Sequence, residues 1–352
     1  MGQPGFFDLQ HRYEGLDAKS DPLVAILAAV PFELFRVKLK TALVKGGLRR
    51  AEVDRKSAAG RKPWDEVLIF KALVLQALYN LSDDQVEYQL RDRLSFMRFV
   101  GLGLEDAVPD AKTLWLYREA LAKAGAVDGL FHQFDGYLKA KGYLAMGGQI
   151  IDATIVPAPR QRNSRDDNAL IKAGETPPEW EAHPAKNRQK DKDARWTKKH
   201  GKSHFGYKNH INIDRRHKLV RRYTVSSASV HDSQKLEDVL DPDNTASGVW
   251  ADSAYRSKET QEMLADRAMK SHIHQRGNRG KQLTPRQEAA NKTRSKVRAR
   301  VEHVFGTQHT SMGGKFVRTV GIVRATVKIG MQNLAYNMRR LVVLERAATA
   351  AT

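Results

Sequence analysis

Three acidic residues stand in the local settings that a two-metal active site requires. Asp152 interrupts the apolar run 149–156 and Asp252 closes the short run 248–252, so we expect both acids on buried strands. Burying an unpaired carboxylate is costly. Glu302 lies in a helical pattern, residues 298–305, in which it is the only acid among several cations. Oxygen ligands from two strands and a helix suit hard divalent cations such as Mg²⁺, which bind phosphate oxygens.

Each acid also has a structural alternative. Asp152 could face solvent on an edge strand, although the apolar residues around it leave little solvent-facing surface. Asp252 could cap the helix that follows, a role compatible with metal binding. Glu302 could pair with Arg298 four residues earlier, which is worth only ~0.3–0.5 kcal/mol. For metal-dependent cleavage of a phosphodiester, we predict that Asp152 bridges two ions ~3.5–4 Å apart and that Asp252 and Glu302 each hold one.

Candidate DNA contacts accompany the acids. Tyr255 and Arg256 follow Asp252, where Arg256 could contact the DNA backbone, although a surface cation is the alternative. His231 follows the third predicted strand and could touch phosphate or a metal-bound water. Residues 276–300 contain nine Lys or Arg against one acid, a net of +8, and lead directly into Glu302. Within this basic segment the candidate DNA contacts are Lys296 and Arg300.

Composition restricts the class of protein. A chain of 352 residues with 41% apolar side chains can bury a sizeable core, and its length favours two domains. The net charge of +20 favours a polyanionic partner, with nucleic acid the obvious candidate. The longest apolar stretch, 23–35, contains Pro31 and is too short to span a membrane, and residues 1–5 lack signal-peptide features. No cysteine is present, which excludes disulfides and thiolate metal sites, and we expect a cytoplasmic protein.

The amino-terminal part is predicted to be helical. In residues 23–145 apolar side chains return every three or four positions. Residues 80–84 have the composition of a helix end followed by a cap, and residues 109–113 that of a helix start. We therefore predict an all-α domain over residues 1–145 that binds DNA or mediates dimerisation. A helical packing domain with a solvated basic face is equally compatible with the pattern.

Strands and helices alternate after residue 146. The predicted strands are 149–156, 205–214, 218–226, 249–252 and 271–275, and the predicted helices are 233–240, 257–269 and 287–308. Residues 214–217 form a tight connection, so the strands on either side should be antiparallel neighbours. The order predicts an α/β (α+β) domain over residues 146–320, with a mixed five-stranded sheet flanked by helices. Residues 157–203 are polar and contain five prolines, which predicts a mobile insertion without regular elements.

Several motifs resemble those of a known enzyme family. They are Ile151-Asp152-Ala153-Thr154, Ala251-Asp252-Ser253-Ala254-Tyr255, the stretch 298–306 around Glu302, the helical segment 64–122 and the tail 332–340. Together they resemble DDE transposases of bacterial insertion sequences, in the group numbered five. The resemblance implies a ribonuclease H-like catalytic fold whose three acids bind two Mg²⁺ ions, or Mn²⁺ in their place. It also implies a C-terminal helix, residues 321–352, that packs on the catalytic domain.

The match to the family's signature around the third acid is partial. Arg298 and Glu302 match the central arginine and glutamate, and the resemblance implies that Arg298 contacts DNA. The flanking tyrosine and lysine are replaced by Ser295 and His309. Lys315 is a possible substitute for the missing lysine as a contact to a DNA phosphate. The departure does not affect the three acids.

The resemblance predicts a DNA transposase. Such an enzyme binds the inverted terminal repeats of its own element, cleaves there and uses the freed 3′-OH to attack double-stranded target DNA. Two ends must be brought together, so we expect a homodimer or a larger assembly. The first alternative is a ribonuclease H-like nuclease that cuts DNA without strand transfer. The second is a non-enzymatic DNA-binding repressor, which would explain the charge but not acids on apolar strands.

Overall fold

The computed structural model describes residues 5, 7–50, 62–199, 201–277, 280 and 282–350. Residues 1–4 of the amino terminus and residues 278, 279 and 281 of the basic segment lie outside the described residues. The chain divides into two compact units. The first comprises Met1–Lys141, Ser311–Gly313 and Gly330–Thr352, and the second comprises Gly142–Thr310 and Gly314–Ile329.

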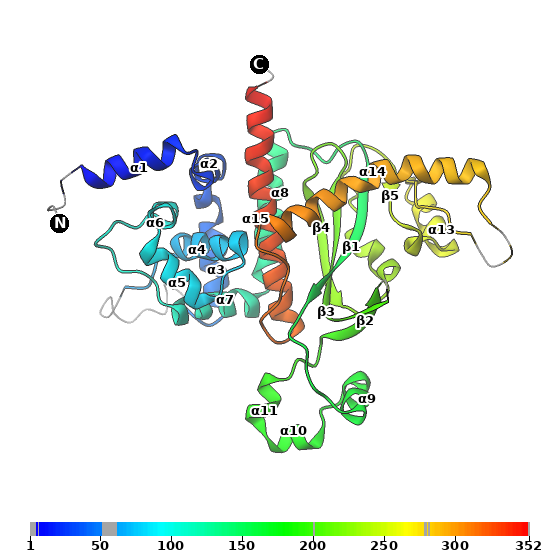
Figure 1. The fold of residues 1–352 in the computed structure, drawn as a ribbon, viewed down its shortest axis with the longest axis horizontal. Coiled ribbons are helices and arrows are strands. Elements are labelled where there is room, and N and C mark those ends of the chain that lie inside the picture. Colours follow the sequence, from blue (N-terminus) through cyan, green and yellow to red (C-terminus); the bar gives the residue numbers. More distant parts are fainter. Residues whose placement is uncertain are drawn as a thin grey trace. The chain divides into compact units, whose positions relative to one another are not determined.

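The first unit is helical, as predicted (Figure 1). Its elements are α1 (Asp8–Ala18), α2 (Pro22–Ala29), η1 (Phe32–Phe35), α3 (Arg36–Lys45), α4 (Glu66–Tyr79), α5 (Asp83–Asp92), α6 (Leu94–Val100), α7 (Ala111–Ala124), α8 (Ala126–Ala140) and the later part of α15 (Ile322–Thr349). Left-handed Asn80 ends α4, and Ser82 begins α5 with a capping box. Asp110 caps α7 by accepting a hydrogen bond from the backbone N–H of Thr113 at 2.6 Å. The predicted helix boundaries at these positions are confirmed.

The second unit contains a mixed sheet (Figure 1). The described strands are β1 (Gln149–Pro157), β2 (Arg195–Lys199), β3 (Lys202–Asp214), β4 (Val220–Ser227), β5 (Gly248–Trp250) and β6 (Lys270–Ser271). Strand β3 is antiparallel to β1, β2 and β4, whereas β5 is parallel to β1 and β6. The helices of this unit after β4 are η3 (Asp232–Lys235), α12 (Leu236–Val239), η4 (Ser253–Tyr255), α13 (Lys258–Asp266), α14 (Pro285–Thr310) and the start of α15. The predicted fold class is confirmed, and β2 adds a sixth strand to the five expected.

Two apolar cores cover the two faces of β1. Ile151 packs with Val249 of β5 and Leu264 of α13 in one core. Val156 packs with Tyr207 of β3 and Ala325 of α15 in the other. Because successive side chains of a strand point to opposite faces, Asp152 shares the face of Val156. Helix α14 packs against β1 and β5, and in Figure 1 it runs across the end of the sheet.

Two strands are shorter than predicted. The strand expected over 249–252 ends at Trp250, because the Asp252 side chain accepts a hydrogen bond from the backbone N–H of Ala254 at 2.7 Å and begins η4. The strand expected over 271–275 is assigned only at its first residues, Lys270–Ser271. Beyond Ser271 the backbone N–H groups of His272 and His274 still donate to the carbonyls of Val249 and Ala251. The Ile273 carbonyl instead accepts hydrogen bonds from two arginine side chains, those of Arg256 and Arg294.

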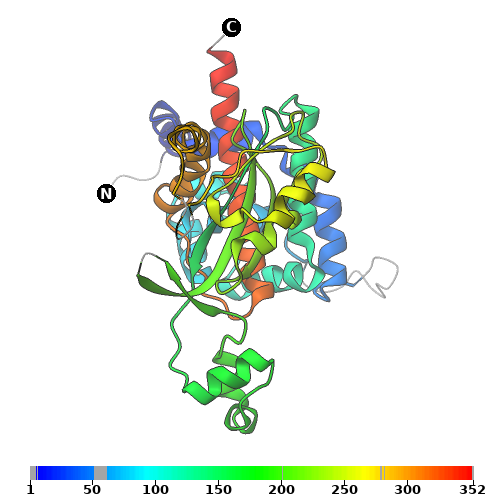
Figure 2. The same cartoon turned by 90° about the vertical axis from the view of Figure 1, so that its right-hand side faces the viewer.

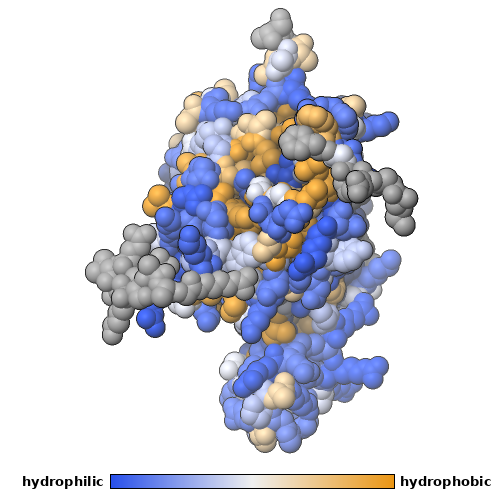
Figure 3. Space-filling view, turned by 90° about the vertical axis from the view of Figure 1, so that its left-hand side faces the viewer, coloured by the Kyte–Doolittle hydropathy of each residue, from blue (hydrophilic) through white to orange (hydrophobic). Residues whose placement is uncertain are grey.

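The insertion is ordered, and the expectation that residues 157–203 lack regular elements is wrong (Figure 2). It contains α9 (Arg165–Ala173), α10 (Pro178–Ala182), α11 (Pro184–Gln189) and β2. Trp180 and Ile171, exposed by 1% and 6%, are the apolar side chains buried in its helices. Asp191, also buried, accepts the Tyr207 hydroxyl hydrogen bond and so attaches the insertion to β3. The surface of this lobe, at the bottom of Figure 3, is mostly hydrophilic, in keeping with its polar composition.

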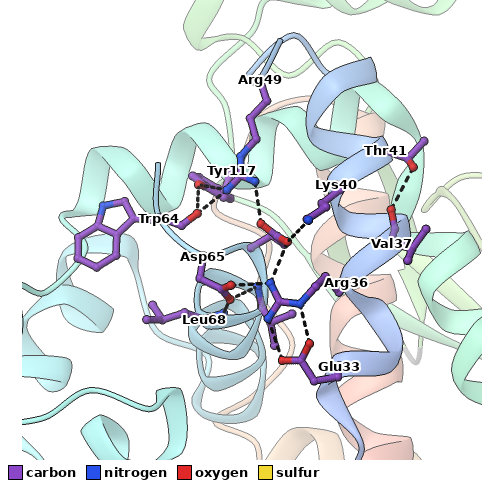
Figure 4. Close-up of polar contacts among 12 residues, drawn as sticks. Glu33, Arg36, Val37, Lys40, Thr41, Arg49, Trp64, Asp65, Leu68 and Tyr117 are labelled. Atoms are coloured by element: carbon purple, nitrogen blue, oxygen red, sulfur yellow. Dashed lines mark hydrogen bonds and ion pairs between the residues drawn. The ribbon is translucent and has the colours of Figure 1, made fainter. Parts of the chain in front are cut away.

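A buried ion-pair cluster joins three helices of the first unit (Figure 4). Glu66 at the start of α4 is only 4% exposed and accepts hydrogen bonds from Arg36 of α3 at 2.9 Å and from Arg49 at 2.7 Å. Arg49 also donates to the hydroxyl of Tyr117 on α7 at 3.0 Å. Burial of Glu66 is tolerated because two guanidinium groups contact its carboxylate.

Candidate active site

Asp152 and Asp252 are brought together by the parallel pairing of β1 and β5. Ile150 lies opposite Trp250 in this pair. Asp152 comes two residues after Ile150, and Asp252 comes two residues after Trp250. Asp252 therefore stands at the carboxyl end of β5, where the chain turns into η4. Ligand sites in α/β sheets form at such strand ends. Its role as a cap, one of the two roles expected from the sequence, is present in the structure.

Burial has the largest effect on the ionisation of Asp152. Its side chain is 14% exposed. The pKa of Asp152 is raised from 3.8 to about 6. Burial is the largest cause and the charge of Asp252 contributes, whereas Arg298 and the backbone N–H of Ala153 act in the opposite direction. The ionised carboxylate is therefore poorly solvated, and the nearby cations compensate for this loss only in part. A bound cation would supply further compensation.

Arg298 connects Asp152 to the third predicted acid. Its Nη1 donates to Oδ2 of Asp152 at 2.8 Å, and its Nη2 donates to Oε1 of Glu302 at 3.1 Å. Glu302 is 61% exposed on α14. It forms the ion pair with Arg298 that the sequence offered as the alternative to metal binding. Throughout the described part of the chain, no group of three or more acidic or histidine side chains lies close enough to hold a metal ion. The donor set at Asp152 and Asp252 nevertheless fits a divalent cation, since carboxylate oxygens are the preferred ligands of Mg²⁺.

Lys315 supplies a cation beside Asp152. Its Nζ donates to Oγ1 of Thr154 at 3.1 Å and lies 4.4 Å from the centre of the Phe305 ring. Thr154 shares the strand face of Asp152, two residues further along β1. Burial lowers the pKa of Lys315 to about 8, with a further decrease from Lys199 and an opposing effect of Asp152. Lys315 is therefore a partly desolvated cation that a phosphate oxygen would stabilise.

Two predicted DNA contacts follow Asp252 in different environments. Tyr255 is 1% exposed and lies in the core with Ile151, and its buried hydroxyl has no hydrogen-bond partner among the described residues. Burial raises the pKa of Tyr255 well above its usual value. Arg256 is exposed and donates to the Ile273 carbonyl at 3.3 Å. Arg256 could contact DNA without any rearrangement of the fold, because it is exposed. The DNA contact of Tyr255 stays a prediction, and the burial of this side chain does not favour it.

The other predicted contacts lie on η3 and α14. His231 is exposed and caps η3, with Nδ1 2.7 Å from Oγ of Ser233, and η3 packs against η4 beside Asp252. Lys296 is exposed on α14. Arg300 donates to the Arg215 carbonyl at 2.7 Å. These three side chains surround the elements that carry the acids, but only Arg298 contacts an acid directly among the predicted cations.

The sequence assigned no role at the site to three side chains near the acids. Lys199 of β2 lies within electrostatic reach of Asp152, but its segment was expected to be irregular. Thr154 belongs to the motif 151–154 that carries the family resemblance, but no contact was predicted for its hydroxyl. His274 lies 3.3 Å from Oγ of Ser295, and burial lowers its pKa with a further decrease from Arg298. From the sequence, His272 and His274 alternate on a predicted strand, a pattern that would indicate zinc only with further ligands, and a zinc site is not expected there.

Comparison with known families agrees with this geometry. Residues 144–338 match the family described as Transposase DDE domain, and residues 11–120 match the family described as Transposase domain (DUF772). No solved structure matches the chain. Across the described residues, each helix is too short or too polar to cross a lipid bilayer. Because the first match covers more than half of the chain, the protein belongs to the DDE transposases of insertion sequences, enzymes that act on DNA with divalent metal ions.

Proposed function

We propose that Asp152, Asp252 and Glu302 hold two Mg²⁺ ions, and that the enzyme cleaves DNA at the inverted terminal repeats of its own element and joins the 3′-OH ends to target DNA. One observation carries this proposal: the buried Asp152, with its pKa raised to about 6, lies beside Asp252 at the ends of two parallel strands. A purely structural acid in that position would destabilise the fold without benefit.

The protein's own residues have distinct roles in this proposal. Asp152 is the proposed bridging ligand. In support, the charge of Asp252 reaches it, and Arg298 donates hydrogen bonds to both Asp152 and Glu302. Ions bound at these carboxylates would supply an activated water and neutralise charge on the attacking and leaving oxygens. In the structure the guanidinium of Arg298 is the counter-charge of Asp152 and Glu302. When ions bind these carboxylates, the guanidinium would be free to donate two parallel hydrogen bonds to a DNA phosphate.

Lys315 is the proposed replacement for the lysine that the family signature places at position 309. Its Nζ already lies on the face of β1 that carries Asp152, held by the Thr154 hydroxyl. Replacing that neutral hydroxyl by a phosphate oxygen would give a stronger, charge-assisted hydrogen bond. Lys199, whose charge also reaches Asp152, would bind a neighbouring phosphate on the same strand of DNA.

The test is a cleavage and joining assay with labelled duplexes that carry the inverted repeats flanking the gene, a target plasmid and Mg²⁺. Asp152→Asn, Asp252→Asn and Glu302→Gln should each abolish cleavage and leave DNA binding intact or slightly tighter, since a negative charge is removed. Glu288→Gln, which changes an exposed acid on the same helix α14, is the matched control and should cleave normally.

The outcomes separate this function from its alternatives. Normal cleavage by any of the three variants removes that residue from the proposed ligand set. Products joined to the plasmid support transposition, whereas nicks without joining support a nuclease without strand transfer. The proposed assembly is a dimer or larger complex on DNA, because both ends must be held together, and light scattering of the complex with end DNA would measure its mass.

A further inference from the structure

A cationic hollow lies between the insertion and the start of α15, and none of its lining residues belongs to the candidate active site. Its volume is about 480 Å³. Its lining residues are Asn187, Arg188, Lys190, Lys192, Asp193, Val320, Gly321 and Arg324. Four of them are cations and one is an acid, so the lining carries a net charge of +3. We call this feature the insertion groove.

The two acids of residues 190–193, Asp191 and Asp193, already accept hydrogen bonds from other groups of the protein. Asp193 accepts a hydrogen bond from the backbone N–H of Ile322 at 2.8 Å and so caps the first turn of α15. Asp191 is directed away from the groove, is 5% exposed and accepts the Tyr207 hydroxyl together with the backbone N–H of Ala194. Asp191 and Asp193 are therefore not the hydrogen-bond partners of Lys190 and Lys192, and both lysines line the groove as cations.

The two lysines are held in place by neutral partners. Lys190 donates to Oδ1 of Asn163 at 2.7 Å and lies 4.8 Å from the centre of the Trp180 ring. Lys192 donates to Oγ1 of Thr176 at 2.9 Å. These contacts restrict the side chains without neutralising them, which lowers the entropy cost of binding an anion. Arg188 and Arg324, both exposed, add charge from the last turn of α11 and the first turn of α15.

We propose that the insertion groove binds backbone phosphates of duplex DNA, at residues other than those that surround the acids. The groove is open and its cations are spread over two elements, so it suits a run of phosphates better than a single small anion. The proposal rests on the family's action on DNA and not on the proposed metal chemistry. It implies that the insertion helps to hold the DNA on which the catalytic unit acts.

The test measures binding of a fluorescent duplex of arbitrary sequence by anisotropy, in EDTA, over a series of salt concentrations. Each lost phosphate contact reduces the slope of log K against log salt by about 0.9. Arg188→Gln/Lys192→Gln should therefore reduce the slope by about 1 to 2 and weaken binding roughly ten-fold at physiological salt. The charge-preserving variant Arg188→Lys/Lys192→Arg should retain both the slope and the affinity.

The matched control is Arg165→Gln/Arg267→Gln, which removes the same charge from the second unit outside the groove. It should change the affinity less than two-fold and leave the slope unchanged. Equal slopes for the groove and control variants would overturn the proposal. If the double groove variant does not fold, the single variant Arg188→Gln changes an exposed side chain and should still lower the slope by about 0.9. Because the assay contains no divalent metal, its result is independent of cleavage.

Discussion

Replacing Asp152 by asparagine should stabilise the folded protein in the absence of divalent metal. The substitution keeps the size and the hydrogen-bonding oxygen of the side chain but removes its charge. In the wild-type protein that charge is 14% exposed, lies beside Asp252 and is contacted by Arg298. Asp152→Asn therefore removes a buried charge that the fold tolerates at a cost.

The magnitude follows from the pKa of Asp152. Burial raises it from 3.8 to about 6. At about 1.4 kcal/mol for each pH unit, ionised Asp152 costs the folded state roughly 3 kcal/mol. Arg298 loses one acceptor charge in the variant, which offsets part of the gain, so we expect a net stabilisation of about 1 to 3 kcal/mol at pH 7.5.

The stabilisation should depend on pH with a defined sign. The folded protein binds the Asp152 proton more tightly than the unfolded chain, so wild-type stability falls as pH rises from about 4 to about 6 and then levels off. The difference between Asp152→Asn and wild type should therefore be near zero below pH 4 and reach its full value above pH 6. Mg²⁺ should stabilise the wild-type protein and not the variant.

Urea unfolding of both proteins between pH 4 and pH 8, in EDTA and in Mg²⁺, measures these differences. Asp266→Asn, which changes an exposed acid at the end of α13, is the control and should behave as wild type in every condition. The reasoning about burial fails if Asp152→Asn is less stable than wild type above pH 6 in EDTA. Equal stabilisation of variant and wild type by Mg²⁺ would remove Asp152 from the ligand set.

Other substitutions test separate contacts. Tyr207→Phe removes the hydroxyl that donates to buried Asp191, and should lower the free energy of unfolding by about 1 to 3 kcal/mol and speed proteolysis of the insertion. Unchanged proteolysis would show that this contact does not hold the insertion. Lys315→Met keeps the apolar stem beside Thr154 but removes the charge, and should slow cleavage of end DNA at least ten-fold, or by about 1.4 kcal/mol, with an unchanged Tm. A normal rate would exclude a phosphate contact. Glu66→Leu leaves two partly buried arginines without their shared carboxylate, although Arg36 keeps Glu33 and Asp65, and should cost about 3 kcal/mol in urea unfolding, whereas a loss under about 1 kcal/mol would contradict the cluster's role.

The parts of the fold that sequence predicts well are those with local signals. Asp152 is identifiable because a single acid interrupts an apolar run long enough to be a buried strand. Ser82 and Asp110 are identifiable because their side chains bond to backbone groups two or three residues away. Both kinds of signal depend only on neighbouring residues, and the structure places the elements where the signals predict them.

The parts that sequence misses depend on contacts between distant segments. The insertion has few apolar residues, and its order depends on Trp180 and on the bond between Asp191 and Tyr207, which composition does not reveal. The Ser164 capping box at the start of α9 was a local signal that could have indicated a helix there. The bond from Arg298 to Asp152 could not be derived, because it requires the packing of α14 against β1, whereas the pair with Glu302 follows from the spacing in the sequence.

The pairing of β1 with β5 has a consequence for how the chain is made. Ile150 and its partner Trp250 are 100 residues apart, so during translation one edge of β1 stays open until the last third of the polypeptide leaves the ribosome. A gene copy shortened before codon 248 would yield a product with an unprotected strand of isoleucines, a template for self-association. Truncated copies of the element would therefore tend to precipitate their own product rather than release a competitor for its ends.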